Sequence, residues 1–221
     1  MTFAVAIDGP AGAGKSTIAK RVAKKLNAIY VDTGAMYRAM ALFLIRNSVD
    51  GSDEEAVSNM IEQAEVSIRF ENGEQLVMLN GENVNGFIRT EEVGNMASAC
   101  SVYPKVRMKL LDLQRDLARK NNVVMDGRDI GTHVLPDANP KIFLTASAKV
   151  RAKRRYDELV AKGETPDLFR IEKDIIERDQ RDMYREIAPL KQAEDAILVD
   201  SSALTIEEVE EKIVALVRET M

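Results

Sequence analysis

The 221-residue chain contains very little cysteine, histidine or aromatic side chain. Its single cysteine, Cys100, excludes an intramolecular disulfide and leaves no cysteine pattern for a metal site. There is no tryptophan, and the one histidine, His133, lies in a loop-like stretch where histidine is more often structural than catalytic. We therefore expect Cys100 to be a small buried apolar residue and assign no chemical role to His133.

Long apolar runs and a targeting segment are also missing. No apolar run is long enough to cross a bilayer, and an apolar strand already begins at residue 3, where a signal peptide would stand. The net charge of −5 argues against a general nucleic-acid surface. The composition predicts a cytoplasmic protein, expected to be a monomer, that binds neither membranes nor nucleic acid.

The clearest motif is a phosphate-binding loop near the N-terminus. Residues 9–16 fit G-x-x-x-x-G-K-[ST] at every fixed position, between a β-branched run and an amphipathic helix. Glycines allow backbone N–H groups to converge on phosphate oxygens, and the helix N-terminus adds its positive dipole end. We interpret the motif as a nucleotide-binding loop rather than a chance glycine-rich turn. The residues assigned to it are Gly9, Pro10, Ala11, Gly12, Ala13, Gly14, Lys15, Ser16 and Thr17.

Apolar strands alternate with helices along the chain. Strands are expected at 3–8, 28–32, 122–126, 141–146 and 196–200. Helices are expected at 15–26, 33–47, 52–64, 90–120, 148–162, 168–184 and from 205 onward, with a new helix beginning at Pro104. Ser52 and Thr205 are expected to open capping boxes with the glutamates three residues later. This alternation predicts an α/β fold with three layers, in which helices cover both faces of a five-stranded parallel sheet.

The pattern changes between residues 65 and 89. Two short strand-like runs, 66–70 and 75–79, are flanked by Asn-Gly pairs, which are hairpin signals. We expect a small antiparallel β insert there. The predicted organisation is one domain over 1–221, with a core (1–64, 90–147 and 186–221), the insert (about 65–89) and a helical region (about 148–185).

Acidic residues close four of the predicted strands. Asp8, Asp32, Asp126 and Asp200 would lie at the carboxyl edge of the sheet, where ligands bind in such folds. Asp126 is typical of an acid that holds Mg²⁺ or its waters beside a nucleotide. A helix cap or a turn residue is an equally good interpretation for each of them. Asp200, which precedes two serines, is interpreted as a turn residue.

Arginine is concentrated in the second half of the chain. One group occupies a single helix face at i, i+3, i+4 and i+7, and contains Arg178, Arg181, Asp182 and Arg185. An earlier group contains Arg151, Arg154 and Arg155. A solvated helix surface would mix lysine and glutamate evenly, whereas arginine suits planar, bidentate contacts to phosphate. We therefore favour an anion site at the later group and leave both interpretations open for the earlier one.

Six segments, in order, resemble the motifs of the bacterial cytidylate kinases, which are P-loop kinases of nucleoside monophosphates. The segments are GPAGAGKST, DTGAMYR, VGNMASACSVYPKVR, DGRDIGT, KIFLTAS and ERDQRDMYREIAPL. The resemblance covers essentially the whole chain, and DGRDIGT and the ERD segment are its most specific parts. Thr33 stands where some members have serine, which keeps the hydroxyl. The resemblance implies transfer of the γ-phosphoryl group of ATP to CMP or dCMP in pyrimidine nucleotide metabolism, with Mg²⁺ as cofactor.

The resemblance also implies residue roles. The cytosine edge would meet Ser98, Arg107 and Asp129. The acceptor phosphate would meet Arg38, Arg128 and Arg185, and the sugar would meet Arg178 and Asp182. Thr33 and Tyr37 would line the same pocket. Catalysis would rest on Lys15, Arg128, Arg181 and Arg185; ATP would also meet Arg154, on a mobile lid over 148–185; and the metal would be held by Ser16 and, through water, Asp126.

Two kinds of alternative remain at this point. The same chemistry on another acceptor, such as AMP, UMP or shikimate, would use the same loop. A GTPase switch would also use it, but the N-K-x-D run with which guanine-specific GTPases bind the base does not occur in this sequence.

Overall fold

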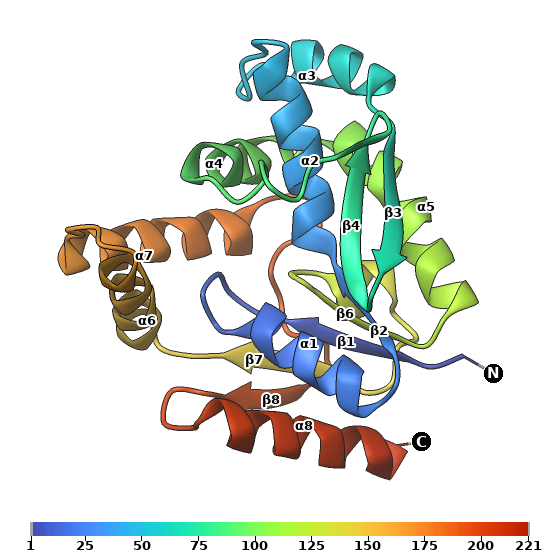
Figure 1. Ribbon diagram of the computed structural model, residues 1–221, viewed down its shortest axis with the longest axis vertical. Helices are drawn as coiled ribbons and strands as arrows, with labels where there is room; N and C mark the ends of the chain where they lie inside the picture. The colour runs from blue at the N-terminus through green and yellow to red at the C-terminus, as the bar shows by residue number, and fades with distance from the viewer. Residues whose placement is uncertain (1, 221) are drawn as a thin grey trace.

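A five-stranded parallel sheet lies between two layers of helices in the computed structural model, which describes residues 2–220 (Figure 1). The strands are β1 (Ala4–Asp8), β2 (Ile29–Asp32), β6 (Val123–Gly127), β7 (Lys141–Thr145) and β8 (Ile197–Asp200), in the order β2-β6-β1-β7-β8. Every neighbouring pair is parallel. The predicted α/β class and strand number are confirmed.

Two separate apolar clusters cover the two faces of this sheet. Helices α1 (Lys15–Lys25) and α8 (Ile206–Thr220) pack on one face, and α2 (Thr33–Arg46) and α5 (Pro104–Lys120) pack on the other. Successive strand residues serve opposite faces, so that Val5 and Ile7 join the first cluster and Ala6 joins the second. Burial of each valine or isoleucine contributes about 1.5–3 kcal/mol, so both faces stabilise the sheet.

The helix starts largely follow the predicted capping chemistry. Pro104 occupies the first turn of α5, and Thr205 and Glu208 form a reciprocal capping box at α8. The prediction for residue 52 was wrong. Asp53 caps α3 (Glu54–Met60) by accepting from the Ala56 N–H, while the Ser52 hydroxyl donates to Asp50. The Asp53 carboxylate satisfies a backbone N–H in the first turn of α3 that would otherwise lack a partner, and a capping box therefore does not form at Ser52.

The insert is a three-stranded antiparallel sheet attached to the edge of the main one. It consists of β3 (Val66–Glu71), β4 (Glu74–Leu79) and the short β5 (Glu82–Asn83). The Gln75 side chain brackets the main chain of Asp32, accepting from its N–H at 2.8 Å and donating to its carbonyl at 3.1 Å. The amide thereby pairs with edge strand β2 as a neighbouring strand would, which ties the insert to the start of α2.

Helices α6 (Ala148–Ala161) and α7 (Leu168–Tyr184) form a hairpin that projects from the sheet (Figure 1). They pack chiefly against each other. A further helix, α4 (Glu91–Cys100), packs against α2. Among residues 2–220, no helix has the length and hydropathy that crossing a bilayer requires.

Candidate active site

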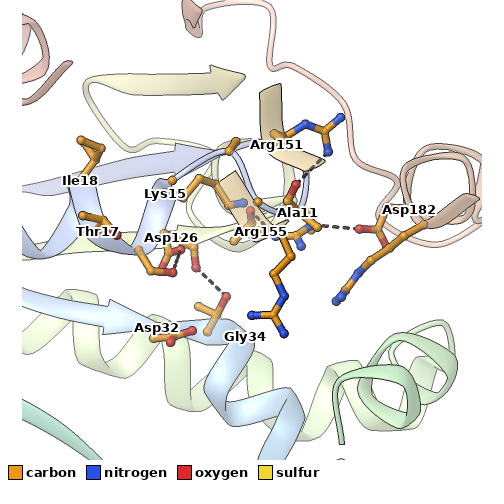
Figure 2. A pocket seen from close by; sticks show the side chains of 18 of the residues that line it. Ala11, Lys15, Thr17, Ile18, Asp32, Gly34, Asp126, Arg151, Arg155 and Asp182 are labelled. Carbon is orange, nitrogen blue, oxygen red and sulfur yellow. Dashed lines mark hydrogen bonds and ion pairs between the residues drawn. The ribbon is translucent and has the colours of Figure 1, made fainter. Parts of the chain in front are cut away.

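A cavity of about 890 Å³ opens at the carboxyl edge of the sheet. Its wall is built from the loop after β1, the starts of α2 and α8, the end of β6, and side chains of α5, α6 and α7. Figure 2 shows these side chains converging from opposite sides on one space. The cavity is therefore shared by segments that lie far apart in the sequence.

The phosphate loop depends on glycine at its two ends. Gly9 has φ +149°, and a Cβ placed on it would lie 1.9 Å from the backbone oxygen of Leu144 in β7. Gly14 caps α1 in the left-handed conformation, with φ +88°. Only glycine adopts both arrangements without strain or a clash, so the spacing of the motif reflects backbone geometry.

Lys15 and Asp126 lie together at the floor of the cavity. The Lys15 Nζ donates to the Pro10 carbonyl at 2.8 Å, and burial together with the charge of Arg128 lowers its pKa. The Ser16 hydroxyl donates to Asp126 Oδ2 at 3.0 Å, and the Tyr30 hydroxyl donates to Oδ1 at 2.9 Å. Burial and the nearby charge of Asp32 raise the pKa of Asp126 to about 6, against the opposing effect of Lys15.

The other strand-end acids have structural partners. Asp32 caps α2 by accepting from the Ala35 N–H, and it forms an ion pair with Arg89 at 2.6 Å. Asp200 accepts from the Ser202 N–H in a turn, as predicted. Asp8 accepts from the backbone N–H groups of Ile130 and Gly131, at 2.8 and 2.7 Å, in the π-helical turn after β6. Asp126 is thus the strand-end acid that meets Ser16.

A buried charged cluster forms the far end of the cavity. Arg107 donates to Asp129 Oδ2 and to the Ser101 carbonyl, and Arg185 approaches Asp129 Oδ1 at 3.5 Å. The guanidinium of Arg107 also lies over the Tyr37 ring, 5.6 Å from its centroid. Arg107 and Asp129 are each 5% exposed. A donor and an acceptor held side by side at a buried position suit a ligand edge that presents the complementary pair.

Arginines of α2, of α7 and of the turn that follows β6 surround the middle of the cavity. Arg128 pairs with Asp182 at 2.9 Å, and Arg38 donates to the Ile88 carbonyl at 3.2 Å. The Nε of Arg178 is a buried donor without a partner among the described residues. Burial and the charge of Arg128 lower the pKa of Arg178 to about 10. Crowded, partly unpaired guanidinium groups favour an anionic ligand that would neutralise them.

The donor set at the floor fits a magnesium ion that a nucleotide brings with it. Mg²⁺ prefers oxygen ligands and keeps several waters, so one hydroxyl and one carboxylate are sufficient beside phosphates. The Ser16 hydroxyl and the Asp126 carboxylate supply that pair. Among residues 2–220, no group of three or more histidine, cysteine or acidic side chains forms a complete protein cage for a metal.

The family comparison agrees with this geometry. The family model described as cytidylate kinase matches residues 5–219. The chain belongs to the cytidylate kinase family. It is similar to the cytidylate kinase of Caldicellulosiruptor saccharolyticus, with 51% identity over 96% of this chain and 94% of that one. It is also similar to the cytidylate kinase of a Geobacillus species, with 49% identity over 97% and 96% of the two chains.

Membership of the cytidylate kinase family makes the protein a kinase, a phosphotransferase. A more distant likeness concerns the fold alone. A crystal structure of an uncharacterized protein from Eubacterium ventriosum superposes with a TM-score of 0.53 at 14% identity, covering 99% of both chains.

Most of the residues predicted for a cytidylate kinase site line the one cavity. Of the residues predicted to bind ATP and its metal, Ala11 to Thr17, Asp126 and Arg154 line it, and so do all ten residues predicted to bind the acceptor. Gly9 and Pro10 belong to the loop but do not line the cavity, and the Pro10 carbonyl accepts from Lys15 Nζ. Arg181 is exposed and instead lines a smaller cavity of about 310 Å³ beside Ser98 and Tyr184, so its predicted catalytic role would require movement of α7.

Two arginines that line the cavity, Arg89 and Arg155, were not assigned to the site from the sequence. Arg89 follows β5 and lines the cavity beside Asp32, and Arg155 extends into the cavity from α6 (Figure 2). Arg155 belongs to the earlier arginine group of the sequence, whose two other arginines form hydrogen bonds within the protein. Arg154, for example, donates to the Ser201 carbonyl at 2.7 Å. Which arginine of a helical run faces a ligand depends on how the helix is rotated against the core.

Proposed function

We propose that the protein transfers the γ-phosphoryl group of ATP to CMP or dCMP, giving ADP and CDP or dCDP. The observation that carries this proposal is that one cavity joins the phosphate loop to the buried cluster of Arg107, Asp129 and Arg185. Membership of the cytidylate kinase family supports the same acceptor. The reaction would supply cytidine diphosphates to pyrimidine nucleotide metabolism.

On the ATP side, the backbone N–H groups of the loop would surround the β-phosphate, and Lys15 would contact the outer phosphates. Ser16, with Asp126 through water, would hold Mg²⁺, which shields charge on the β- and γ-phosphates. Arg154 and the apolar residues at the start of α8 would contact the adenosine end, because they line the cavity beyond the loop.

On the acceptor side, the proposed base site matches the hydrogen-bonding pattern of cytosine. Cytosine presents an amine donor at N4, which the Asp129 carboxylate would accept, and acceptors at N3 and O2, which Arg107 would satisfy. Ser98, Thr33 and Tyr37 would complete the pocket. Arg38, Arg128 and Arg185 would hold the acceptor phosphate, and Arg178 and Asp182 would meet the sugar.

Catalysis in this proposal is positioning and charge neutralisation. The attacking group is a phosphate oxygen that is already ionised at neutral pH, so no general base is required. Lys15, Arg128 and Arg185 would neutralise charge on the transferring group and align it with the acceptor. Closure of the α6–α7 hairpin would exclude water from the reaction. Arg181 is proposed to join these cations in the closed state, and the enzyme is proposed to act as a monomer.

An acceptor panel tests the assignment. ADP formation from ATP would be followed with CMP, dCMP, UMP, AMP and shikimate as separate acceptors, at matched concentrations with Mg²⁺. We expect the highest kcat/KM with CMP or dCMP. A higher value with AMP or shikimate would contradict the proposed acceptor while leaving the phosphate loop intact.

A further inference from the structure

Arg151 contacts three separate parts of the protein through one guanidinium group. Its Nε donates to the Ala146 carbonyl at 2.9 Å, and its Nη1 donates to the Ala11 carbonyl at 2.8 Å. The same group forms a two-point ion pair with the Asp179 carboxylate, with Nη1 to Oδ1 at 3.1 Å. The Arg151 side chain is 5% exposed and that of Asp179 is 13% exposed.

The contact with Ala11 bears on phosphate binding. A trans peptide is planar and holds its C=O and N–H in opposite directions, so fixing the Ala11 carbonyl also fixes the Gly12 N–H. Figure 2 shows Arg151 next to the loop, with its bond to Ala11 marked. Because Gly12 lines the cavity, Arg151 sets the orientation of a donor that phosphate oxygens would meet.

The contact with Asp179 bears on the acceptor site. Asp179 follows Arg178 in α7 and precedes Asp182 by three residues, so all three move with one rigid helix. Arg178 and Asp182 line the acceptor side of the cavity, and Asp182 pairs with Arg128. Arg151 lies in the first turn of α6, so its bonds to Ala11 and Ala146 together with its ion pair to Asp179 connect α7 to the core.

We propose that Arg151 is a positioning residue that links the ATP loop to the acceptor-binding helix through Asp179. ATP in the loop would stabilise the orientation of Ala11 that Arg151 recognises, and Arg151 would then hold α7 where Arg178 and Asp182 meet the acceptor. Binding of each substrate would strengthen binding of the other by the same factor. This inference rests on the proposed function for the identity of the two ligands.

The test is calorimetric titration of CMP into the enzyme, with and without a saturating non-hydrolysable ATP analogue and Mg²⁺. In the wild type, we expect the analogue to tighten CMP binding by about fivefold or more. In Asp179→Asn, we expect the tightening to fall below about twofold, with CMP binding alone within about twofold of the wild type. Arg151→Lys should lose the tightening as well, because an ammonium group cannot reproduce the planar two-point contact.

A matched control uses a solvent-facing ion pair on α6, the helix that carries Arg151. Asp157 pairs with Lys153 one turn away on α6, and both side chains are more than half exposed. Asp157→Asn should therefore retain the wild-type tightening.

The inference is overturned if Asp179→Asn keeps the wild-type tightening, or if the wild type transfers phosphoryl to CMP but shows no tightening. A wild type that neither binds nor phosphorylates CMP would contradict the proposed function, and with it the link. Thermal melts of both variants verify that the measured protein is folded.

Discussion

Buried charges at the acceptor end are the residues from which base choice is expected to arise. Arg107, Asp129 and Arg185 are held against one another, and removing the charge of one member changes the partners of the rest. UMP presents a carbonyl where CMP presents the N4 amine, and a proton on N3. A pocket arranged for one pattern disfavours the reversed one, because desolvated polar groups are left unpaired.

Asp129→Asn should therefore narrow the preference for CMP over UMP. The amide can turn its NH₂ toward the uracil carbonyl, so kcat/KM should fall more for CMP than for UMP. The expected narrowing is about tenfold or more, equivalent to about 1.4 kcal/mol. Steady-state kinetics with both acceptors measure it. An unchanged ratio would mean that the base is recognised elsewhere and that Asp129 only supports Arg107.

Asp32 should control the acid side of the pH profile. Asp126 has a pKa raised to about 6 by burial and by the charge of Asp32. As the pH falls through that value, Asp126 gains a proton and can no longer hold a magnesium water, so kcat/KM for ATP should fall. Asp32→Asn removes a negative charge next to Asp126 and therefore lowers the pKa of Asp126. The asparagine side chain still offers an oxygen that can accept the hydrogen bond capping α2. The fall should then begin at lower pH.

The control for this profile is Asp200→Asn, which changes an acid in an exposed turn. Its kcat/KM for ATP should show the wild-type acid limb. If the profile of Asp32→Asn overlays that of the wild type, Asp32 does not set the pKa of Asp126.

At the scale of elements, the loop after β1 depends on its close approach to β7. A Cβ on Gly9 would clash with the backbone of Leu144, and β7 is hydrogen-bonded to a strand on each side, so its backbone cannot easily move aside. Gly9→Ala should therefore lower the free energy of unfolding by about 3 kcal/mol or more. Gly73→Ala, also at positive φ but with nothing within 4 Å, should cost only about 1–2 kcal/mol.

Urea unfolding of the two alanine variants measures this difference directly. Equal losses would show that the clash at Gly9 relaxes and that only the positive φ matters.

Elements with strong local signals were predictable from the sequence. The phosphate loop, the five strands, Pro104 at the start of α5 and the Thr205 capping box all follow from residues that lie next to one another. The site contacts that the sequence did not indicate join distant segments. Asp8 accepts hydrogen bonds from two backbone N–H groups that lie 122 and 123 positions later in the sequence. Arg151 donates to Ala11, from which it is separated by 140 positions. No local pattern encodes such pairs, because they exist only once the sheet has formed.

At the scale of the whole molecule, we expect the α6–α7 hairpin to close over bound nucleotides. The connection between the two helices, residues 162–167, is exposed over most of its length and contains a trypsin site at Lys162. Cleavage there should slow when ATP analogue and CMP are both present. Cleavage after Lys120, at the exposed end of α5 in the core, provides the reference rate. Equal rates at Lys162 with and without ligands would contradict closure.

The proposed function depends on one step, the transfer of the γ-phosphoryl group from ATP to CMP in the shared cavity. The most direct measurement follows the label of γ-³²P-ATP after mixing with CMP, Mg²⁺ and enzyme, with chromatographic separation of the products. We expect label in CDP for the wild type, and a loss of several orders of magnitude in that rate for a folded Lys15→Ala variant. Label that appears as inorganic phosphate at a rate independent of CMP, or in CDP at a near-normal rate in Lys15→Ala, would contradict the proposed transfer.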